Sequence, residues 1–317
     1  MTTLQPFVAR PQVKPLKGVR ILSLALNLPG PAALMRCREL GATCVKLEPP
    51  GGDPMMAYNS SAYAAMHQSV RTSVADLKSK PGQTLLHREL AKADILLTSF
   101  RPSALAKLGL SWKALKQPYP GLSQVAIVGS PGVLAETPGH DLTYLAEMGL
   151  VTGLDLPATL YADMGGSLMT IQAVLQAVLY KASHGKRLYQ EVALASAAAY
   201  LALPRTWGLT QPGAPVGGGH AGYRVYACKD GRVALAALEP HFATRICAAV
   251  GIESTDLHVM LMPATQQTIA AWLLGKTRKQ LDRLALEKDI PLHTLPPTEA
   301  DLAAPSGRSV PLKRWPA

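Results

Sequence analysis

Apolar residues in the first 130 positions of the chain fall into short runs that read as buried strands. Such runs occupy residues 18–26, 93–100 and 122–129, and a further run at 44–50 ends in two prolines. A short apolar run bounded by Gly or Pro is typical of a strand that is covered on both faces. The pattern therefore predicts several strands of one buried sheet.

Two stretches between these runs have helical character. Residues 28–42 carry Pro29 near their start and Gly41 near their end, which is the usual placement of these residues at helix termini. Residues 79–93 repeat leucine at helical spacing. Strands that alternate with helices indicate an α/β domain with a mostly parallel sheet.

The pattern changes in the second half of the chain. Residues 167–185 place apolar side chains on one helical face, and the Pro- and Gly-rich stretch 203–222 is the best candidate for a linker. Beyond it, residues 223–240 read as a β-hairpin and residues 264–289 as a helical region. We find no internal repeats.

Composition restricts the class of protein. Of 317 residues, 48% are hydrophobic and 17% are charged, so the chain can bury a sizeable core and is not of the disordered class. The N-terminus lacks the apolar segment of a signal peptide, and no apolar run approaches the roughly 20 residues that span a bilayer. The four cysteines show no C-x-x-C spacing, so we expect reduced thiols, no metal site and a cytoplasmic protein with no membrane partner.

The net charge of +11 favours an anionic ligand. Lys and Arg are spread along the chain and only 5% of residues are aromatic, which leaves little to stack on nucleic-acid bases. Positive potential concentrates small anions equally well. We therefore expect a charged small molecule and no nucleic acid.

The turn after the first strand lacks a nucleotide signature. It reads NLPGPAA at residues 27–33, without the G-x-G-x-x-G of dinucleotide-binding folds, and no Walker A sequence occurs in the chain. This argues against a nicotinamide or nucleoside-triphosphate enzyme.

Asp163 is the first candidate for chemistry. It ends an apolar segment just before the predicted helix and is followed by Gly165 and Gly166. Glycines allow a substrate to approach the backbone, and the free N–H groups of a helix N-terminus stabilise developing negative charge. The structural alternative is that Asp163 is simply a helix cap.

His140 and Glu239 are further candidates. His140 follows the turn residues Pro138 and Gly139, and a loop histidine is a natural general acid or base. Glu239 stands at the end of the predicted hairpin. Both have an alternative as ordinary surface residues. The chain has no Gly-x-Ser-x-Gly elbow and no cluster with metal-ligand spacing.

The order of these motifs resembles a known family. PLKGVRILSL, PGPAALMRCRELGATCVKLEPPGGDP, ADILLTSFRPSALAKLGLSW, PGHDLTY, ADMGGS and YRVYACKDGRVALAALEP are similar, in this order, to segments of the family III CoA-transferases. That superfamily includes carnitine CoA-transferase, formyl-CoA transferase and α-methylacyl-CoA racemase.

The resemblance implies a fold and an assembly. It predicts a Rossmann-like, CoA-binding large domain over residues 1–200, a smaller α+β domain with its linkers over 201–290, and a C-terminal return to the large domain over 291–317. It also implies an interlocked homodimer. Acyl-CoA or CoA would be the substrate, with no separate cofactor.

The resemblance also implies roles for the candidate residues. In the transferases an aspartate at the position of Asp163 attacks the thioester and carries the acyl group covalently. In the racemases the aspartate and the histidine that matches His140 exchange the α-proton from opposite sides, and the glutamate that matches Glu239 supports the histidine. GHD at 139–141 and PGPAA at 29–33 are similar to the racemase motifs.

The CoA site that the resemblance predicts is partly altered here. The basic loop of the family reads HQSVRTS at residues 67–73, and Met56 replaces a frequent arginine. The residues that match the CoA site are Leu28, Pro29, Arg71, Lys78, Phe100, Arg101 and Lys107.

Three functions are compatible with these residues. The first is an α-methylacyl-CoA racemase-like enzyme that moves the α-proton of a thioester through His140 and Asp163. The second is a CoA-transferase in which Asp163 forms a covalent intermediate and His140 is dispensable. The third is a non-catalytic or repurposed member that binds an anionic ligand or a partner protein.

Overall fold

The computed structural model describes residues 13–253 and 256–298 of the chain. The chain folds into two compact units, Met1–Ala202 and Leu203–Ala317. The sequence predicts the corresponding boundary between residues 200 and 201, two positions earlier.

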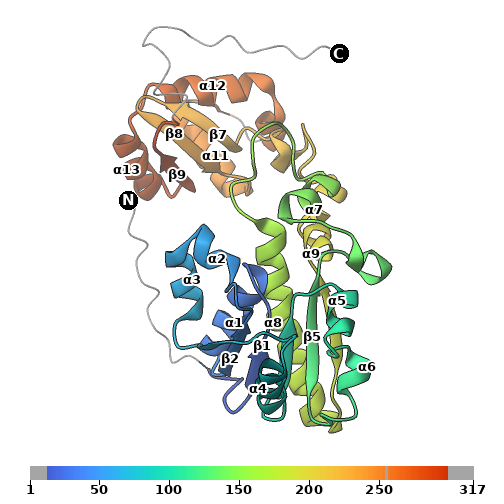
Figure 1. Ribbon diagram of the computed structural model, residues 1–317. Coiled ribbons are helices and arrows are strands. Elements are labelled where there is room, and N and C mark those ends of the chain that lie inside the picture. The colour runs from blue at the N-terminus through green and yellow to red at the C-terminus, as the bar shows by residue number, and fades with distance from the viewer. Residues whose placement is uncertain (1–12, 254–255, 299–317) are drawn as a thin grey trace. The chain divides into compact units, whose positions relative to one another are not determined.

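The first unit is built on a six-stranded sheet in which every neighbouring pair is parallel (Figure 1). Its strands are β1 (Arg20–Ser23), β2 (Thr43–Glu48), β3 (Arg71–Val74), β4 (Ile95–Thr98), β5 (Ser123–Val128) and β6 (Tyr189–Ala193). The predicted α/β class with a parallel sheet is confirmed. The search for apolar runs missed two strands, the exposed and mostly polar edge strand β3 and the strand β6 at the other edge of the sheet.

The order of the strands creates a natural place for a ligand. The sheet runs β3-β2-β1-β4-β5-β6, so the chain order reverses between β1 and β4. The loops that leave the carboxyl ends of these two strands turn to opposite faces and leave a crevice, where open α/β folds bind their ligands.

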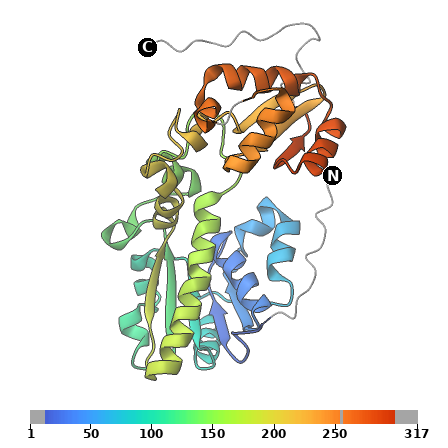
Figure 2. The same cartoon turned by 180° about the vertical axis from the view of Figure 1, so that it is seen from behind.

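The helices of the first unit cover both faces of this sheet. They are α1 (Pro29–Glu39), α2 (Pro54–Tyr58), α3 (Ser60–His67), α4 (Lys80–Leu90), α5 (Pro102–Lys107), α6 (Trp112–Leu115), α7 (Asp141–Glu147), α8 (Tyr161–His184) and α9 (Leu194–Leu201), with a 3₁₀ turn at Gly132–Glu136. Figure 2 shows α8 lying across one face of the sheet.

Two cores form because side chains alternate along each strand. Ile21 joins the core under α1 and α8, whereas the next residue, Leu22, joins the core under α4 and α5. Alternation of this kind with both faces buried produces the continuous apolar runs in the sequence.

The helix that carries Asp163 begins earlier than predicted. Helix α8 starts at Tyr161 with Leu160 as its N-cap, and it ends at Gly185, which has the left-handed conformation (φ 66°) usual for this position. Asp163 therefore lies inside the first turn, and its side chain is not the helix cap. The alternative of a purely capping aspartate is wrong.

The second unit has its own antiparallel sheet. The predicted hairpin is confirmed as β7 (Tyr223–Cys228) and β8 (Gly231–Ala236), and the predicted helical region comprises two helices. The helices of this unit are α10 (Leu203–Thr206), α11 (Pro240–Val250), α12 (Pro263–Leu274) and α13 (Arg278–Lys288), with 3₁₀ turns at Pro215–Gly217 and Leu257–Leu261.

One predicted domain boundary needs correction. Strand β9 (Leu292–Leu295) pairs antiparallel with β8, with Leu292 opposite Leu235. Its backbone hydrogen bonds therefore place residues 292–295 in the second unit, and the predicted return to the large domain from residue 291 is wrong for this stretch. Residues 299–317 lie outside the described part of the chain.

The structure bears on two further features of the sequence, the cysteines and the apolar character of the helices. Cys37, Cys44, Cys228 and Cys247 are free and buried. Within the described residues, no helix combines the length and apolar character that crossing a membrane requires.

Gly30 provides a test of how α1 packs against the end of β1. A Cβ atom at Gly30 would lie 2.2 Å from the Cβ of Ala25, which is fixed to the backbone and cannot rotate away. Alanine normally stabilises a helix by up to ~1 kcal/mol over glycine. We expect Gly30→Ala instead to lower the free energy of unfolding by about 1–3 kcal/mol in urea denaturation followed by circular dichroism.

The matched control is Gly51→Ala, because nothing lies within 4 Å of the added Cβ at Gly51. Its free energy of unfolding should stay within about 0.5 kcal/mol of the unchanged protein. Equal stability of the two variants would show that the close approach of α1 is not a constraint.

Candidate active site

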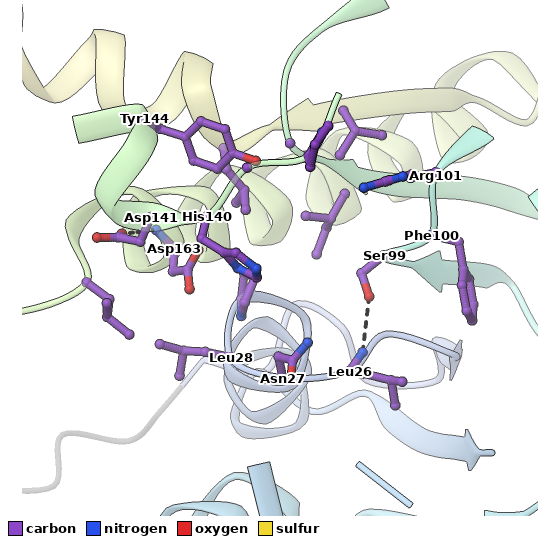
Figure 3. A pocket seen from close by; sticks show the side chains of 18 of the residues that line it. Leu26, Asn27, Leu28, Ser99, Phe100, Arg101, His140, Asp141, Tyr144 and Asp163 are labelled. Atoms are coloured by element: carbon purple, nitrogen blue, oxygen red, sulfur yellow. Dashed lines mark hydrogen bonds between the residues drawn. The ribbon is translucent and has the colours of Figure 1, made fainter. Parts of the chain in front are cut away.

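A pocket of about 600 Å³ lies in the first unit at the carboxyl ends of the parallel strands (Figure 3). The loops after β1, β4 and β5 line it, together with the starts of α7 and α8. It occupies the crevice that the strand order predicts. Its lining is largely apolar, and its polar members include His140, Asp141, Asp163, Arg101 and Asn27.

His140 and Asp163 come from different helices and lie side by side in this pocket (Figure 3). His140 is the exposed N-cap residue of α7, and its N–H donates to the Thr143 hydroxyl at 3.0 Å. Asp163 is half-buried in the first turn of α8. The structure thus brings the two predicted catalytic side chains together.

Asp141 holds these two elements in place and was not among the predicted site residues. Its Oδ1 accepts the backbone N–H of Asp163 at 2.9 Å. The first N–H groups of a helix lack partners within the helix, so this carboxylate caps α8 from α7. The signal in the sequence was the position of Asp141 directly after His140.

The environment of Asp163 favours its protonated form. Burial, and next the nearby Asp141 carboxylate, raise the pKa of Asp163 from 3.8 to about 6, while His140 acts in the opposite direction. A carboxyl group with a pKa near 6 can both accept and donate a proton close to neutral pH.

Tyr144 explains why His140 follows a Pro-Gly turn. Tyr144 is buried, and a Cβ atom at Gly139 would lie 2.6 Å from its ring. A Cβ at Gly129 would lie 2.3 Å from the Tyr144 hydroxyl. Only glycines leave room for this ring between the loop after β5 and the start of α7. Burial, and next the Asp163 carboxylate, raise the pKa of Tyr144.

Gly165 and Gly166 have a different role from the predicted one. They are the fifth and sixth residues of α8, beyond the N–H groups that a helix leaves unpaired at its start. A Cβ at Gly165 would lie 3.3 Å from the Ala197 Cβ, and one at Gly166 would lie 2.3 Å from Leu194. These glycines let α8 and α9 pack closely, and the prediction that their backbone binds an oxyanion is wrong.

Most of the predicted CoA-binding residues lie at or near the pocket. Leu28, Pro29, Phe100 and Arg101 line it. Lys78 lines a smaller pocket of about 170 Å³ that shares Phe100 with the first. Lys107 is exposed on α5. Two hydrogen bonds from Ser103 are the main cause that lowers the pKa of the nearby Glu136, and the charges of Arg101 and Lys107 lower this pKa further.

Arg71 lies at the wrong edge of the sheet for this site. It begins β3 and stands opposite Val45, at the amino ends of the parallel strands, whereas the pocket lies at their carboxyl ends. Its guanidinium is 2.6 Å from the Glu89 carboxylate. The prediction that Arg71 belongs to the same ligand site is therefore wrong.

Glu239 belongs to the second unit. It is the N-cap residue of α11 and precedes Pro240. Its support of His140 stays a prediction.

The comparisons with known proteins identify the family. The model of CoA-transferase family III matches residues 16–308, and the chain belongs to this family. The chain is 30% identical over 266 residues to α-methylacyl-CoA racemase from Mus musculus, which covers 76% of this chain and 66% of the relative.

Relatives with other names match at similar identity. Cinnamoyl-CoA:phenyllactate CoA-transferase from Clostridium sporogenes is 34% identical over 185 residues, which covers 52% of this chain and 45% of that protein. The chain thus spans about half to two thirds of the length of these curated relatives.

Solved structures share the fold. A protein from Mycobacterium tuberculosis (Rv3272) superimposes with a TM-score of 0.77 at 23% identity, covering 89% of this chain and 85% of its own. A CAIB/BAIF family protein from Brucella suis gives a TM-score of 0.74 at 23% identity, covering 93% of this chain and 87% of its own.

The raised pKa of Asp163 leads to a prediction about stability. In the folded state Asp163 keeps its proton up to about pH 6, whereas in the unfolded chain it loses it near 3.8. Stability therefore falls as the pH rises through this interval. Asparagine cannot ionise, so we expect Asp163→Asn to be more stable by about 1–3 kcal/mol at pH 7.5, with the advantage gone below about pH 4.

Urea denaturation at several pH values measures this difference. Asp94→Asn serves as the control, because the Asp94 carboxylate accepts the Arg20 N–H at 2.9 Å and contacts Lys181 at 2.8 Å at the other edge of the sheet. That variant should lose stability at pH 7.5. An Asp163→Asn protein that also loses stability there would show that the ionised carboxylate is well stabilised.

Proposed function

We propose that the protein catalyses 1,1-proton transfer at the α-carbon of an acyl-CoA thioester, as an α-methylacyl-CoA racemase does. The observation that carries this proposal is the pairing of His140 with Asp163 in one pocket, where the pKa of Asp163 is about 6. The racemase relatives, at 29–30% identity, support the same function.

The reaction needs two proton-handling groups and no other reactant. One group removes the α-proton, the thioester becomes an enolate, and the other group returns a proton to the opposite face. An imidazole and a carboxyl group whose pKa is raised to about 6 can exchange protons in both directions. Largely apolar walls exclude water and strengthen the electrostatic interactions of the enolate.

Basic side chains around the pocket support a CoA ester as the substrate. Arg101 lines the pocket, and within the part of the chain that the structure describes its guanidinium has no carboxylate partner within 4.0 Å. Lys78 lines the neighbouring pocket. Such groups bind phosphate through charge-assisted hydrogen bonds.

A CoA-transferase is the second candidate, supported by relatives of that name at 26–34% identity. In this reaction a carboxylate oxygen of Asp163 attacks the thioester carbonyl and CoA leaves as its thiolate. The CoA thiolate then attacks the Asp163 carbonyl of the resulting acyl anhydride, which releases the donor acid and leaves CoA bound to Asp163 as a thioester. The acceptor carboxylate displaces CoA from this thioester, and the CoA thiolate attacks the acceptor's carbonyl in the new anhydride to give the product acyl-CoA and free Asp163. His140 has no necessary part in these steps. A repurposed member of the family would bind the ligand without either reaction.

Isotope exchange distinguishes these functions. We expect the protein to interconvert the two enantiomers of a 2-methylacyl-CoA in D₂O with uptake of deuterium at the α-carbon, observed by NMR and chiral chromatography, and His140→Gln and Asp163→Asn each to slow the interconversion by at least about 100-fold. His184→Ala is the control, since His184 is exposed at the other end of α8.

Interconversion of the enantiomers that persists without His140 contradicts the two-base scheme, because the remaining base can exchange the α-proton only on its own face. Absent exchange, together with a CoA adduct on Asp163 detected by mass spectrometry, favours transfer. Binding of CoA with neither result indicates a non-catalytic member.

We also propose that the chain forms a homodimer. Met164, Leu168 and Leu179 lie along α8 at helical spacing and are 41%, 67% and 67% exposed. An apolar stripe of this kind commonly marks an interface. Light scattering after size exclusion should give twice the 33.7 kDa chain mass, and Leu168→Asp should shift the mass toward the monomer. A monomeric protein at micromolar concentration contradicts the dimer.

The cytoplasmic location stays a proposal, supported by four free buried cysteines.

A further inference from the structure

A completely buried lysine lies beneath the pocket. Lys46, on β2, is 0% exposed, and its ammonium contacts the carboxylates of Asp53 and Glu48, the latter at 3.1 Å. The third neighbour is the Nε2 atom of His67, at 2.8 Å. An ammonium group has three N–H donors, so these three acceptors satisfy it completely.

The surrounding side chains fix the orientation of this network. The Nδ1 atom of His67 is 2.7 Å from the Tyr63 carbonyl oxygen. Nδ1 therefore carries the proton, and Nε2 accepts from Lys46. Burial lowers the pKa of His67, which favours this neutral form. The Tyr63 hydroxyl donates to Glu48 at 2.8 Å.

Lys46 takes the position that a metal ion would occupy. Glu48, Asp53 and His67 offer ligand atoms within 4.8 Å of one another. The ammonium already contacts all three groups, so we assign no metal to them. The buried cation has a structural role instead.

Asp53 connects this network to the wall of the pocket. One oxygen contacts Lys46, and the other accepts the N–H of Asn27 at 3.0 Å and that of Met55 at 2.9 Å. Both Asn27 and Met55 line the pocket. Asp53 itself is only 3% exposed. Its carboxylate thus joins the loop after β1 to the start of α2.

The loop after β1 needs such a partner because its backbone is strained. Asn27 has a φ of 65°, in the left-handed region that costs an L-residue conformational energy. On its other side the N–H of Leu26 donates to the Ser99 hydroxyl at 3.1 Å (Figure 3). Leu28 and Pro29, which follow directly, also line the pocket.

We propose that Asp53, held in place by Lys46, is a positioning residue that keeps Asn27 in its left-handed conformation and thereby sets the affinity of the pocket for its ligand. Neither Asp53 nor Lys46 lines the pocket. The choice of CoA as the ligand rests on the proposed function. We call the hydrogen bonds from the Asn27 and Met55 N–H groups to Asp53 the clamp. The clamp lies within the protein and involves no ligand.

The first experiment measures the clamp without any ligand. Asp53→Asn removes the charge that the Asn27 and Met55 N–H groups face and places an amide beside Lys46. We expect hydrogen exchange of these two amides, followed by mass spectrometry or NMR, to accelerate by at least about tenfold. Asp94→Asn is the matched control: it too loses a carboxylate that accepts a backbone N–H and contacts a lysine. It should leave both amides unchanged.

The second experiment measures the consequence for binding. By calorimetry, Asp53→Asn should weaken the binding of CoA at least about tenfold, and Asp94→Asn should not. Glycine at position 27 relieves the strain, so adding Asn27→Gly to Asp53→Asn should restore more affinity than adding Asn27→Ala does. If Asp53 only stabilised the fold, Asn27→Gly and Asn27→Ala would change the CoA affinity of the Asp53→Asn protein equally.

Each outcome decides a separate statement. Unchanged exchange at Asn27 in a folded Asp53→Asn protein overturns the clamp, and faster exchange with unchanged CoA affinity overturns its role in binding. If the unaltered protein does not bind CoA, the proposed function and the ligand part of this inference fail, while exchange still decides the clamp. If Asp53→Asn does not fold, two single variants replace it. The backbone amide of residue 27 must then undergo hydrogen exchange at least about threefold faster in Asn27→Ala than in Asn27→Gly. Equal exchange rates overturn the proposal.

Discussion

The Asp141 carboxylate accepts the backbone N–H of Asp163, and the arrangement of the candidate active site depends on this hydrogen bond. It joins the start of α7, where His140 lies, to the first turn of α8, where Asp163 lies. The same carboxylate places a negative charge beside Asp163 and, after burial, helps to raise its pKa to about 6. One group therefore sets both the position and the proton affinity of its neighbour, which is why geometry and electrostatics are coupled here.

The pocket around this pair is held by close contacts that leave little freedom. Glycines at 129 and 139 make room for the buried ring of Tyr144, and Gly30 lets α1 approach the end of β1. Beneath the opposite wall, the buried ammonium of Lys46 neutralises part of the charge of Asp53 and Glu48. A half-buried carboxyl group with a raised pKa costs stability above its pKa, and a site that uses one trades stability for chemistry. The rigid surroundings are consistent with a site that holds its reactive groups in place before the ligand arrives.

The chain belongs to CoA-transferase family III and shares its fold. Family membership does not choose between proton transfer and acyl transfer, because relatives with both kinds of name match the chain at similar identity. The difference between these reactions depends on whether His140 participates. Its position beside Asp163 in the pocket is the feature that favours proton transfer.

The apolar runs of the sequence by themselves determined strands β1, β2, β4 and β5 of the parallel sheet, because burial on both faces leaves a continuous apolar signal in a strand. Short local motifs, the Pro-Gly turn before His140 and the glycines after Asp163, also pointed to these two residues. Only the tertiary structure revealed that Asp141 caps α8, that Gly165 and Gly166 serve helix packing, and that Arg71 lies at the opposite edge from the pocket. Strand direction decides the edge at which a residue lies, and contacts between distant segments decide which groups become partners. Lys46 and Asp53, seven positions apart and without any local signature in the sequence, form a buried pair for the same reason.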